Sequence, residues 1–447
     1  MVHLFESGGR KLVFDPVSGA LHAVDELAWE VIGALARGGT VGAGGPDVAA
    51  VLTEIKTLTA QGSLFTPDRG PALYTPPPFS PKSLCLMVAQ ECNLRCAYCF
   101  AGEGSYGGGG LMPEEVAFKA VDFLLAHSGA VRTVEVDFFG GEPLLNFPLI
   151  TAVVDYGTET ARAHGKEISF TVTTNALLLD EGKTRFLLEK GVNVVLSLDG
   201  RQEVHDRFRR FPDGSGSYDR VLANARRFFR EWAAAPRSSY CYIRGTFTRE
   251  NLDFARDFCH LTELGFTAIS LEPVVVSPAE PYAIRGADLA ATGAEYERLA
   301  EAYLDLWRRG KPVRFFHFEF DPAGGPCLTK RLTGCGAGFS YVAVDVDGRL
   351  YPCHQFVGQP AFILGDLATG TVRQEVVEVF RHAHVYNKPA CSACWARFLC
   401  GGGCHAAAYL VNGDITKPYA IGCSLMRKRL ECALYLQAAL AETNSEE

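Results

Sequence analysis

Between residues 83 and 275, short apolar runs alternate with amphipathic segments about every thirty residues. Each run has the length of a strand, and the six runs are 83–90, 133–139, 168–174, 192–198, 240–248 and 268–275. The segments between them show the helical period, and Pro113 stands at the first helical position of 113–127. This alternation predicts an α/β fold with a parallel sheet and helices outside it. Six βα units, rather than eight, predict a partial (β/α)6 barrel over residues 83–320, with ligands at the C-terminal strand ends.

Residues 1–68 show a different pattern, which predicts a small independent unit. "HLFESGGRKLVFD" alternates as two strands around a Gly-Gly turn, and a third, edge strand is expected near Ala20–Asp25. Two helical patterns follow, at 25–38 and 46–62, and each ends at glycine. The Pro-rich stretch that follows predicts a semi-rigid linker, assigned to residues 69–82.

Residues 321–447 lose both periods, and glycine, proline and cysteine dominate there. Two short hairpin-like pieces surround "YVAVDVDGRLYPC". We expect this region to be too irregular to hold a large apolar core, so that metal sites supply the missing folding energy.

Composition and charge exclude several classes of function. The 447 residues are long enough for two or three domains, and the net charge of −8 favours neither nucleic acid nor an anionic membrane as a partner. No stretch of eighteen residues is uninterruptedly apolar, and the first residues lack the layout of a signal peptide. These features predict a cytoplasmic protein with no nucleic-acid or membrane partner.

Fifteen cysteines are unusual for a chain of this kind. In a reducing compartment they indicate metal binding or catalysis rather than disulfides. Three lie at 92–99 and eight lie between 327 and 423. The remaining four are expected to be small buried hydrophobic residues: Cys85, Cys241, Cys259 and Cys432.

The triplet Cys92-x3-Cys96-x2-Cys99 follows directly after the first predicted strand. A structural zinc site needs four protein ligands. Three cysteines on a [4Fe–4S] cluster instead leave one iron open to a small molecule. A redox loop or a zinc loop is the alternative interpretation of this triplet.

Polar motifs end the next strands of the predicted sheet. In "FFGGEP", Gly140 and Gly141 would let a ligand approach the backbone, and Glu142 could accept hydrogen bonds from an ammonium group. Further candidates at strand ends are Thr174, Asn175, Ser197 and Asp199, although Asp-Gly after a strand is also typical of a plain turn. Arg209 and Arg244 are candidate partners for a carboxylate, or else structural or solvated arginines.

These motifs resemble the radical S-adenosylmethionine (SAM) superfamily, whose signature is this cysteine spacing with an aromatic, here Tyr98, before the third cysteine. The resemblance implies that Cys92, Cys96 and Cys99 hold a [4Fe–4S] cluster whose open iron binds SAM. It further implies that the glycine motif binds the SAM amino group and that the later strand ends face the rest of SAM. The implied SAM contacts are Tyr98, Gly140, Gly141, Glu142, Thr174, Asn175, Ser197, Asp199 and Arg209.

The C-terminal cysteines, with Gly348 between two of them, resemble the SPASM extension of that superfamily. The resemblance implies two auxiliary [4Fe–4S] clusters, and thus three clusters in the chain. Auxiliary cluster I would take Cys327, Cys335, Cys353 and Cys404, and auxiliary cluster II would take Cys391, Cys394, Cys400 and Cys423. Cys327 is either a permanent ligand or a ligand that a substrate thiolate exchanges with. Two zinc sites are the structural alternative, because CxxC spacing alone does not separate zinc from iron–sulfur.

Nearly the whole chain resembles the radical SAM maturases of the SCIFF peptide ("six cysteines in forty-five residues"), through segments such as "CNLRCAYCFAGEGSYGG" and "CSACWARFLCGGGC". Residues 1–68 resemble the winged-helix-like RiPP recognition element, where RiPP stands for a ribosomally made, post-translationally modified peptide. Such an element binds a leader peptide by strand addition at a sheet edge. The implied partners are a Cys-rich precursor peptide and a low-potential electron donor, a flavodoxin or ferredoxin.

The resemblance implies a thioether-forming reaction, in which a cysteine sulfur joins the α-carbon of an acceptor residue, typically threonine, in the same peptide. A radical from SAM would abstract the α-hydrogen, a substrate thiolate near auxiliary cluster I would form the C–S bond, and that cluster would take the excess electron. Bonding at a β-carbon, or carbon to carbon, stays open, because acceptor choice depends on sub-ångström placement.

Two further alternatives stay open. In anaerobic sulfatase maturation, which makes formylglycine, an acidic residue follows the equivalent of Cys353, whereas His354 occupies that place here. A non-catalytic, zinc-holding peptide-binding protein would explain the first and last regions, but not the three-cysteine site or the "GGEP" motif.

Overall fold

The computed structural model of the chain describes residues 1–447 except 42–44, 237–238, 320, 322–326 and 444–447. All six predicted strands form within two residues of their expected bounds: β4 (Ser83–Ala89), β6 (Thr133–Gly140), β7 (Glu167–Thr174), β8 (Asn193–Ser197), β10 (Cys241–Phe247) and β11 (Ala268–Pro273). Each pairs in parallel with the next one along the chain, and β12 (Arg314–Phe315) adds to β11. Within the described residues the sheet does not close, which confirms the α/β fold with an open barrel.

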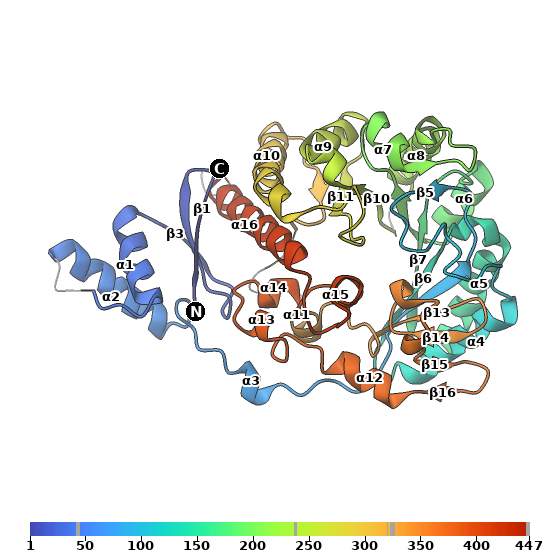
Figure 1. The fold of residues 1–447 in the computed structure, drawn as a ribbon, viewed down its shortest axis with the longest axis horizontal. Coiled ribbons are helices and arrows are strands. Elements are labelled where there is room, and N and C mark those ends of the chain that lie inside the picture. The colour runs from blue at the N-terminus through green and yellow to red at the C-terminus, as the bar shows by residue number, and fades with distance from the viewer. Residues whose placement is uncertain (42–44, 237–238, 320, 322–326, 444–447) are drawn as a thin grey trace.

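The helices between these strands cover the outside of the sheet (Figure 1). They are α4 (Glu114–His127), α5 (Phe147–Ala163), α6 (Glu181–Glu189), α7 (Gln202–Phe208), α8 (Tyr218–Ala234), α9 (Phe254–Glu263) and α10 (Leu289–Arg308). Strand β6 shows how the sheet divides its faces, since Val134, Val136 and Phe138 are fully buried in the large apolar core, whereas the alternate residues are less buried. Glu135 and Asp137 are among these alternate residues, so the inner face of the sheet carries polar groups and is suited to a ligand.

The C-terminal region extends this sheet, which the sequence pattern did not predict. Strand β13 (Tyr341–Val344) pairs in parallel with β4, and antiparallel strands β14 (Arg349–Tyr351), β15 (Gly365–Asp366) and β16 (Thr371–Val372) follow it. The pairing of β13 with β4 joins segments more than 250 residues apart, so no local period signals it. Strand β14 runs antiparallel to β13, so Cys353, two residues after β14, lies back toward the start of β4.

The expectation that the C-terminal region holds no large apolar core is wrong. Its short helices are α11 (Leu328–Thr333), α12 (Gln374–Arg381), α13 (Pro389–Ser392), α14 (Arg397–Cys400) and α15 (His405–Asn412), and the long α16 (Ala420–Thr443) ends the chain. Phe339, Phe356, Phe362 and Phe380 are buried in the same core as the barrel. The aromatic residues are irregularly spaced along the chain, and the turns between short elements bring them together.

The N-terminal region, called here the N-terminal module (residues 1–68), forms a three-stranded antiparallel sheet and two helices, as its pattern predicts. Its elements are β1 (His3–Ser7), β2 (Arg10–Phe14), β3 (Leu21–Val24), α1 (Glu26–Ala36) and α2 (Pro46–Ala60). Asp25 caps α1 by accepting a hydrogen bond from the Ala28 amide at 2.8 Å. The connection after the module holds only the single turn α3 (Gly70–Leu73).

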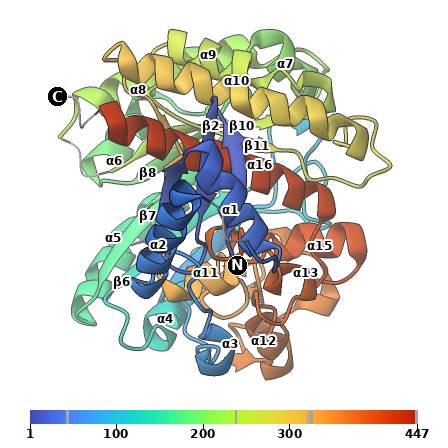
Figure 2. The same cartoon turned by 90° about the vertical axis from the view of Figure 1, so that its left-hand side faces the viewer.

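The expectation that this module is an independent unit is not met, because both faces of its middle strand β2 carry buried residues. Val13 belongs to a core shared with α1 and α2, whereas Phe5, Leu12 and Phe14 belong to the core of the main body. Figures 1 and 2 show α16 running past the module's sheet toward α10. Adjacent apolar residues in "KLVF" therefore pack on opposite faces of one strand, one face against the module's helices and the other against the main body. No helix within the described ranges is both long and apolar enough to cross a bilayer.

The pairing of β12 with β11 generates a stability prediction. Phe315 is fully buried and meets Phe258 edge-on, whereas its neighbour Phe316 is 60% exposed. We expect Phe315→Ala to lower the free energy of unfolding by about 3–5 kcal/mol, and Phe316→Ala by about 1 kcal/mol or less. Denaturant midpoints of the two variants check this difference. Equal losses would mean that β12 does not bury Phe315 as described.

Candidate functional site

A cavity of about 250 Å³ lies at the mouth of the barrel, where the C-terminal ends of its strands meet. Ten of the residues predicted from the motifs and the family resemblance line it: Cys92, Cys96, Tyr98, Cys99, Gly140, Gly141, Thr174, Asn175, Ser197 and Arg209. Glu142 and Asp199 do not line it, because both side chains lie behind its wall. The structure therefore brings most of the predicted site residues together, whereas these two carboxylates accept hydrogen bonds from protein groups that form the cavity wall.

The three cysteines of the triplet share one loop after β4. The loop is held to the barrel by a short antiparallel pair, β5 (Arg95–Cys96) with β9 (Arg209–Arg210). Desolvation raises the pKa of Cys92 to about 11 and that of Cys96 to about 12, and the charge of the Cys99 thiolate adds to both shifts. Thiolates are the metal-binding form. A cationic cluster within the triplet would remove this cost, so the donor set fits the predicted [4Fe–4S] group.

Glu142 organises the cavity wall from behind. Its Oε1 accepts hydrogen bonds from the Leu144 amide at 3.0 Å and the Thr174 hydroxyl at 2.7 Å, and its Oε2 accepts one from the Asn175 amide at 2.8 Å. Burial raises the pKa of Glu142 to about 7 against these stabilising hydrogen bonds. The expectation that this carboxylate accepts directly from a bound ammonium group is not supported, since it is fully buried and already occupied.

The two glycines before Glu142 are required by the protein backbone itself. A Cβ on Gly140 would lie 2.1 Å from the carbonyl oxygen of Ala89, and one on Gly141 would lie 2.2 Å from that of Glu91. Gly140 also has a φ of +136°, which disfavours other residues. The close approach of β6 to the cysteine loop thus explains both glycines, and the exposed backbone they leave forms part of the cavity wall.

Asp199 connects three elements at the opposite wall. Its Oδ2 accepts a hydrogen bond from the Tyr98 hydroxyl, and its Oδ1 accepts from Arg209 Nε at 3.1 Å and from the Thr246 amide at 3.0 Å. The Arg209 guanidinium lies 5.5 Å from the centre of the Tyr98 ring. Asp199 thus uses its lone pairs within the protein, while the remaining N–H groups of Arg209 stay available to the cavity.

A second face of the cavity was largely missed from the sequence. It is formed by Arg244, Glu272, His354 and Gln355, of which only Arg244 and His354 drew attention beforehand. Glu272 lies 3.3 Å from His317 Nε2 and 3.3 Å from Arg429 Nη1. Desolvation raises the pKa of Glu272, but the interactions with His317, Arg429 and Arg244 outweigh it and lower the pKa to about 2. The signal that could have found Glu272 is its place at the end of β11, the same rule that found the other residues.

His354 brings the C-terminal region into this cavity. It lies in a short 3-10 turn (His354–Phe356), and its ring centre lies 4.7 Å from that of Phe139 and 5.7 Å from that of Phe100. Its Nδ1 is 3.0 Å from the Tyr341 hydroxyl. Burial, and then Arg244, lower the pKa of His354 to about 4, so the ring is neutral at neutral pH.

Four C-terminal cysteines line a second cavity, also of about 250 Å³: Cys391, Cys394, Cys400 and Cys423. Cys391 and Cys400 lie in α13 and α14, Cys394 lies between these two helices, and Cys423 lies in the first turn of α16. Desolvation raises the pKa of Cys391 to about 11. The buried Lys388 ammonium donates to the Gly402 carbonyl at 2.9 Å and favours the Cys391 thiolate. Four thiols around one void, beside a buried cation, fit the group predicted for auxiliary cluster II.

The remaining cysteines form a looser group between the two cavities. Desolvation, and then the charges of Cys335 and Cys404, raise the pKa of Cys353, so these three thiols lie near one another. Cys327 precedes α11 and is exposed, and the glycines and proline just before it lie outside the described residues. Its assignment to auxiliary cluster I stays a prediction.

The spacing of these thiols bears on the zinc alternative. Among the residues that the structure describes, no three His, Cys, Asp or Glu side chains lie close enough to hold one metal ion. Zinc would require four sulfurs about 2.3 Å from one centre. Each cysteine of a cubane cluster binds a different iron, so the ligands of such a cluster stand farther apart than the ligands of one zinc ion.

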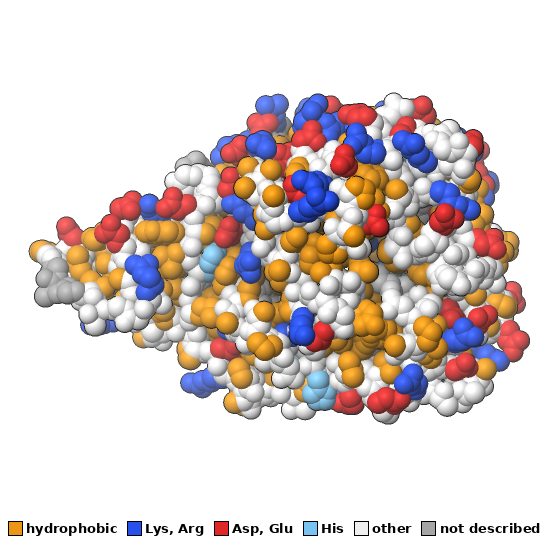
Figure 3. All heavy atoms as spheres, viewed as in Figure 1, with side chains coloured by type: hydrophobic (Ala, Val, Ile, Leu, Met, Phe, Trp, Pro, Cys, Tyr) orange, Lys and Arg blue, Asp and Glu red, His pale blue; other side chains and the backbone are white. Residues whose placement is uncertain are grey.

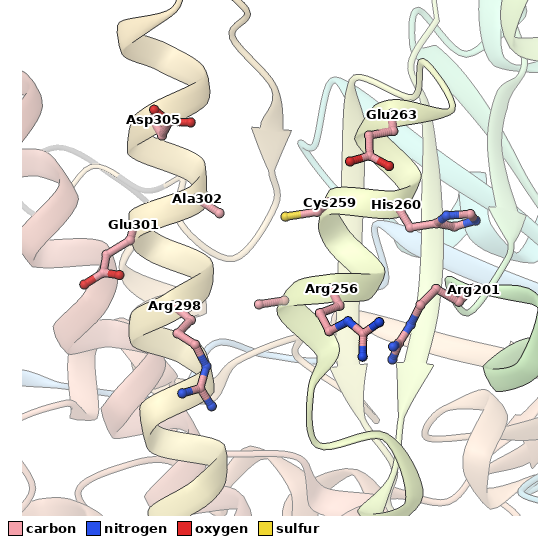
Figure 4. A pocket seen from close by; sticks show the side chains of 10 residues that line it. Arg201, Arg256, Cys259, His260, Glu263, Arg298, Glu301, Ala302 and Asp305 are labelled. Atoms are coloured by element: carbon pink, nitrogen blue, oxygen red, sulfur yellow. The ribbon is translucent and has the colours of Figure 1, made fainter.

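The single cysteines follow their prediction with one exception. Cys85, Cys241 and Cys432 are buried, whereas Cys259 is half-buried and lines a groove between α9 and α10. This groove has a volume of about 720 Å³, and Figure 4 shows arginines toward one end and acidic residues toward the other. Arg201 is already paired with Asp257 at 2.8 Å. We assign the groove no chemistry.

Comparison with known proteins agrees with this geometry. Residues 86–233 match the profile of the radical SAM superfamily, and residues 335–395 match SPASM, an iron–sulfur cluster-binding domain. The chain therefore carries a radical SAM domain, which implies a [4Fe–4S] cluster and SAM, followed by a SPASM domain.

One protein of similar sequence and two solved structures of similar fold illustrate what the chain resembles. A cysteine-type anaerobic sulfatase-maturating enzyme of Clostridium novyi is 24% identical over 355 residues, covering 72% of this chain and 88% of that protein. The structure of native anSMEcpe with bound AdoMet and Cp18Cys peptide has a TM-score of 0.65 at 22% identity, over 81% of this chain and 99% of that one. Streptococcus suis SuiB bound to S-adenosylmethionine has a TM-score of 0.56 at 16% identity, over 94% of this chain and 98% of that one. A match over 94% of the chain must include most of the N-terminal module.

The position of Glu142 generates a prediction for the cavity wall. Glu142→Gln turns an amide group toward either the Asn175 amide or the Thr174 hydroxyl and the Leu144 amide, so donors face one another. We expect a loss of about 1–3 kcal/mol in the free energy of unfolding and faster hydrogen exchange at the Asn175 amide. Glu159→Gln, on the exposed side of α5, is the matched control and should change stability by less than about 0.5 kcal/mol. A Glu142→Gln variant as stable as its control would disprove this role.

Proposed function

We propose that this chain, with its radical SAM and SPASM domains, modifies a Cys-rich ribosomal precursor peptide by forming thioethers between cysteine sulfurs and acceptor α-carbons, with threonine as the expected acceptor. The observation that carries this proposal is the two-faced cavity at the barrel mouth. One face presents the three-cysteine loop and the backbone of "GGEP", and the other presents polar groups from β10, β11 and the C-terminal region.

The first face suits the proposed cluster and SAM. Cys92, Cys96 and Cys99 would hold three irons of the cluster. Bound there, the cluster and SAM supply a carbon radical able to abstract a hydrogen atom. Asn175 and Ser197 offer hydrogen bonds, and the guanidinium of Arg209, fixed through Nε by Asp199, offers free N–H groups to a carboxylate.

The second face suits a peptide. Glu272, held ionised by its cationic neighbours, can accept a hydrogen bond from a backbone N–H, and Arg244 and Gln355 can donate to carbonyl oxygens. Phe100 and Phe139 also line the cavity, with ring centres 6.5 Å apart, and a peptide bound over them would shield from water the space where a hydrogen atom would move. The peptide would thus be positioned by polar groups beside an aromatic part of the wall.

The N-terminal module suits recognition of the leader part of such a peptide. Strand β3 is the outer strand of its sheet, and no described strand pairs with its free edge. Apolar side chains, including Leu27 and Trp29 of α1, remain partly exposed on the module, and Figure 3 shows hydrophobic atoms gathered there. A leader strand added beside β3 would gain backbone hydrogen bonds and apolar contacts. SuiB, which matches the chain including this region, has also been solved bound to its precursor peptide SuiA.

The three proposed clusters need an external source of electrons, for which a flavodoxin or ferredoxin is the expected donor. Cys327 is the proposed exchangeable ligand of auxiliary cluster I, because it is exposed and immediately precedes the six-residue helix α11. A substrate thiolate taking its place on iron would be held deprotonated close to the barrel mouth.

Sulfatase maturation is the second candidate, and the similarity to sulfatase-maturating enzymes favours it. At the position after Cys353 the chain presents the neutral His354 ring between two phenylalanines, where that reaction would need a carboxylate base. Bonding to a β-carbon, or carbon to carbon, would use the same cavity and is separated from the main proposal only by its product.

Peptide modification is tested with the reduced, fully loaded protein, SAM and the small Cys-rich peptide encoded beside its gene, incubated without oxygen. We expect products lighter by two hydrogens per bridge, with fragmentation placing each sulfur on an α-carbon. The Cys92→Ala, Cys96→Ala, Cys99→Ala triple variant should make no product and no 5′-deoxyadenosine. A formylglycine residue, or an unmodified peptide despite SAM cleavage, would reject the thioether proposal.

Leader recognition is tested by hydrogen–deuterium exchange of the full chain with and without the leader peptide. We expect the leader to slow exchange at the free-edge amides of Leu21–Val24 by about tenfold or more, since strand addition pairs them. The amides of β1, the other outer strand of the same sheet, serve as the internal control and should not change. Protection confined to another part of the protein would assign leader binding elsewhere.

A further inference from the structure

The segment 391–400, called here the ligand loop, has two neighbours. On one side, Cys391, Cys394 and Cys400 line the second cavity together with Cys423. On the other side, Trp395 and Arg397 contact the N-terminal module, as the following distances show. The loop consists of two four-residue helices, α13 and α14, so its own backbone hydrogen bonds do little to keep it ordered.

Trp395 packs against aromatic residues of the first two strands of the module. The His3 ring stacks on the Trp395 ring with centres 3.9 Å apart and planes 5° apart, and Phe14 meets the same ring edge-on at 6.1 Å. The Nε2 of His3 also lies 3.0 Å from the Oε1 of Glu431 on α16. Trp395 directly follows Cys394, so the order of this stack depends on the order of the cysteine loop.

Arg397 forms the second link, and it is almost completely buried with 4% of its side chain exposed. Its Nη2 donates to Asp68 Oδ2 at 2.9 Å, at the end of the module, and its Nη1 donates to the Cys394 carbonyl at 3.1 Å. The Tyr386 hydroxyl donates to the other oxygen of Asp68 at 3.2 Å. One buried guanidinium thus joins the backbone of the ligand loop to the module.

Helix α16 provides a third link between cavity and module. Cys423 lies in its first turn, and farther along it Tyr435 lies under the β1–β2 turn. A Cβ on Gly8 would come within 2.2 Å of the Tyr435 ring, so turn and helix are in tight contact. Arg10 also pairs with Glu442 near the end of the helix.

We propose that docking of the N-terminal module and loading of the Cys391–Cys423 cavity are coupled, so that a chain lacking a cluster there releases the module from the main body. This inference rests on the proposed function, because it takes that cavity to be a cluster site. The ligand loop is short, and a cluster bound by its thiols would keep it ordered. Without that cluster, nothing offsets the conformational entropy lost when Trp395 and Arg397 are held against the module. By thermodynamic linkage, docking of the module must raise the affinity of the four cysteines for the cluster by the same factor by which the cluster raises the docking equilibrium constant.

If docking and cluster loading are coupled, the module can present a bound leader peptide correctly only when the second cavity holds its cluster. A leader bound at β3 is held at a fixed place relative to the barrel mouth only while the module is docked. An incompletely loaded chain would therefore bind leader without presenting the peptide to the cavity, and the effective concentration of substrate at the site would fall.

The forward test compares two single ligand losses in the full chain, purified without oxygen. Cys423→Ser removes a ligand from the second cavity without touching a residue that contacts the module, and Cys96→Ser removes one at the barrel mouth. We expect hydrogen exchange of residues 1–14 to be about tenfold faster in Cys423→Ser and unchanged in Cys96→Ser. No change in Cys423→Ser, or an equal change in both variants, would overturn the proposal.

The reverse test uses two neighbouring glycines. Gly8 and Gly9 have φ values of +56° and +74°, so alanine is similarly strained at either position. A Cβ at Gly9 meets nothing within 4 Å, whereas one at Gly8 collides with Tyr435. In the Cys92→Ala, Cys96→Ala, Cys99→Ala background, we expect Gly8→Ala to lose iron to a ferrous chelator about tenfold faster than Gly9→Ala. Equal rates would overturn the proposal.

Two outcomes separate this inference from the proposed function. Wild-type protein with no iron bound by the four cysteines would reject both the cluster assignment and the coupling. Coupled docking and iron retention in a chain that leaves the Cys-rich peptide unmodified would support the coupling while rejecting the thioether function.

Discussion

Desolvated thiols are the constraint on which the rest of this structure depends. Desolvation raises the pKa values of six cysteines spread over all three groups: Cys92, Cys96, Cys353, Cys391, Cys400 and Cys423. Neutral thiols so placed would be poor ligands, and the short loops that carry them have little regular structure of their own. A cationic cluster in each group would both restore the thiolates and tie these loops together, which would link the stability of the fold to the proposed chemistry.

The barrel supplies the rigid part of this arrangement. Its strand ends place Glu142 and Asp199 behind the cavity wall, where each carboxylate joins backbone and side chains from three elements. The pairing of β13 with β4 then brings His354 to the same cavity. The site is therefore composite, with one face from the barrel and the other completed by the C-terminal region.

The sequence predicted the six barrel strands, the module's elements and ten cavity residues, because each depends on local period or on a position at a strand end. It did not predict the pairing of β13 with β4, or the docking of Phe5, Leu12 and Phe14 on the main body, because these contacts join distant segments. Glu142 and Asp199 were assigned to a ligand because a carboxylate at a strand end looks the same in sequence whether it faces the cavity or supports its wall. Glu272 does face the cavity but was missed, because "SLEP" contains no motif that separates it from the end of any other strand.

The central claim, that three groups of cysteines hold three cubane clusters, is tested most directly by metal and sulfide analysis of the protein purified without oxygen, combined with Mössbauer spectroscopy. The account predicts about twelve irons and as many sulfides per chain, all in [4Fe–4S] form, with no zinc. Zinc bound by the C-terminal cysteines, or iron confined to a single cluster, would contradict it.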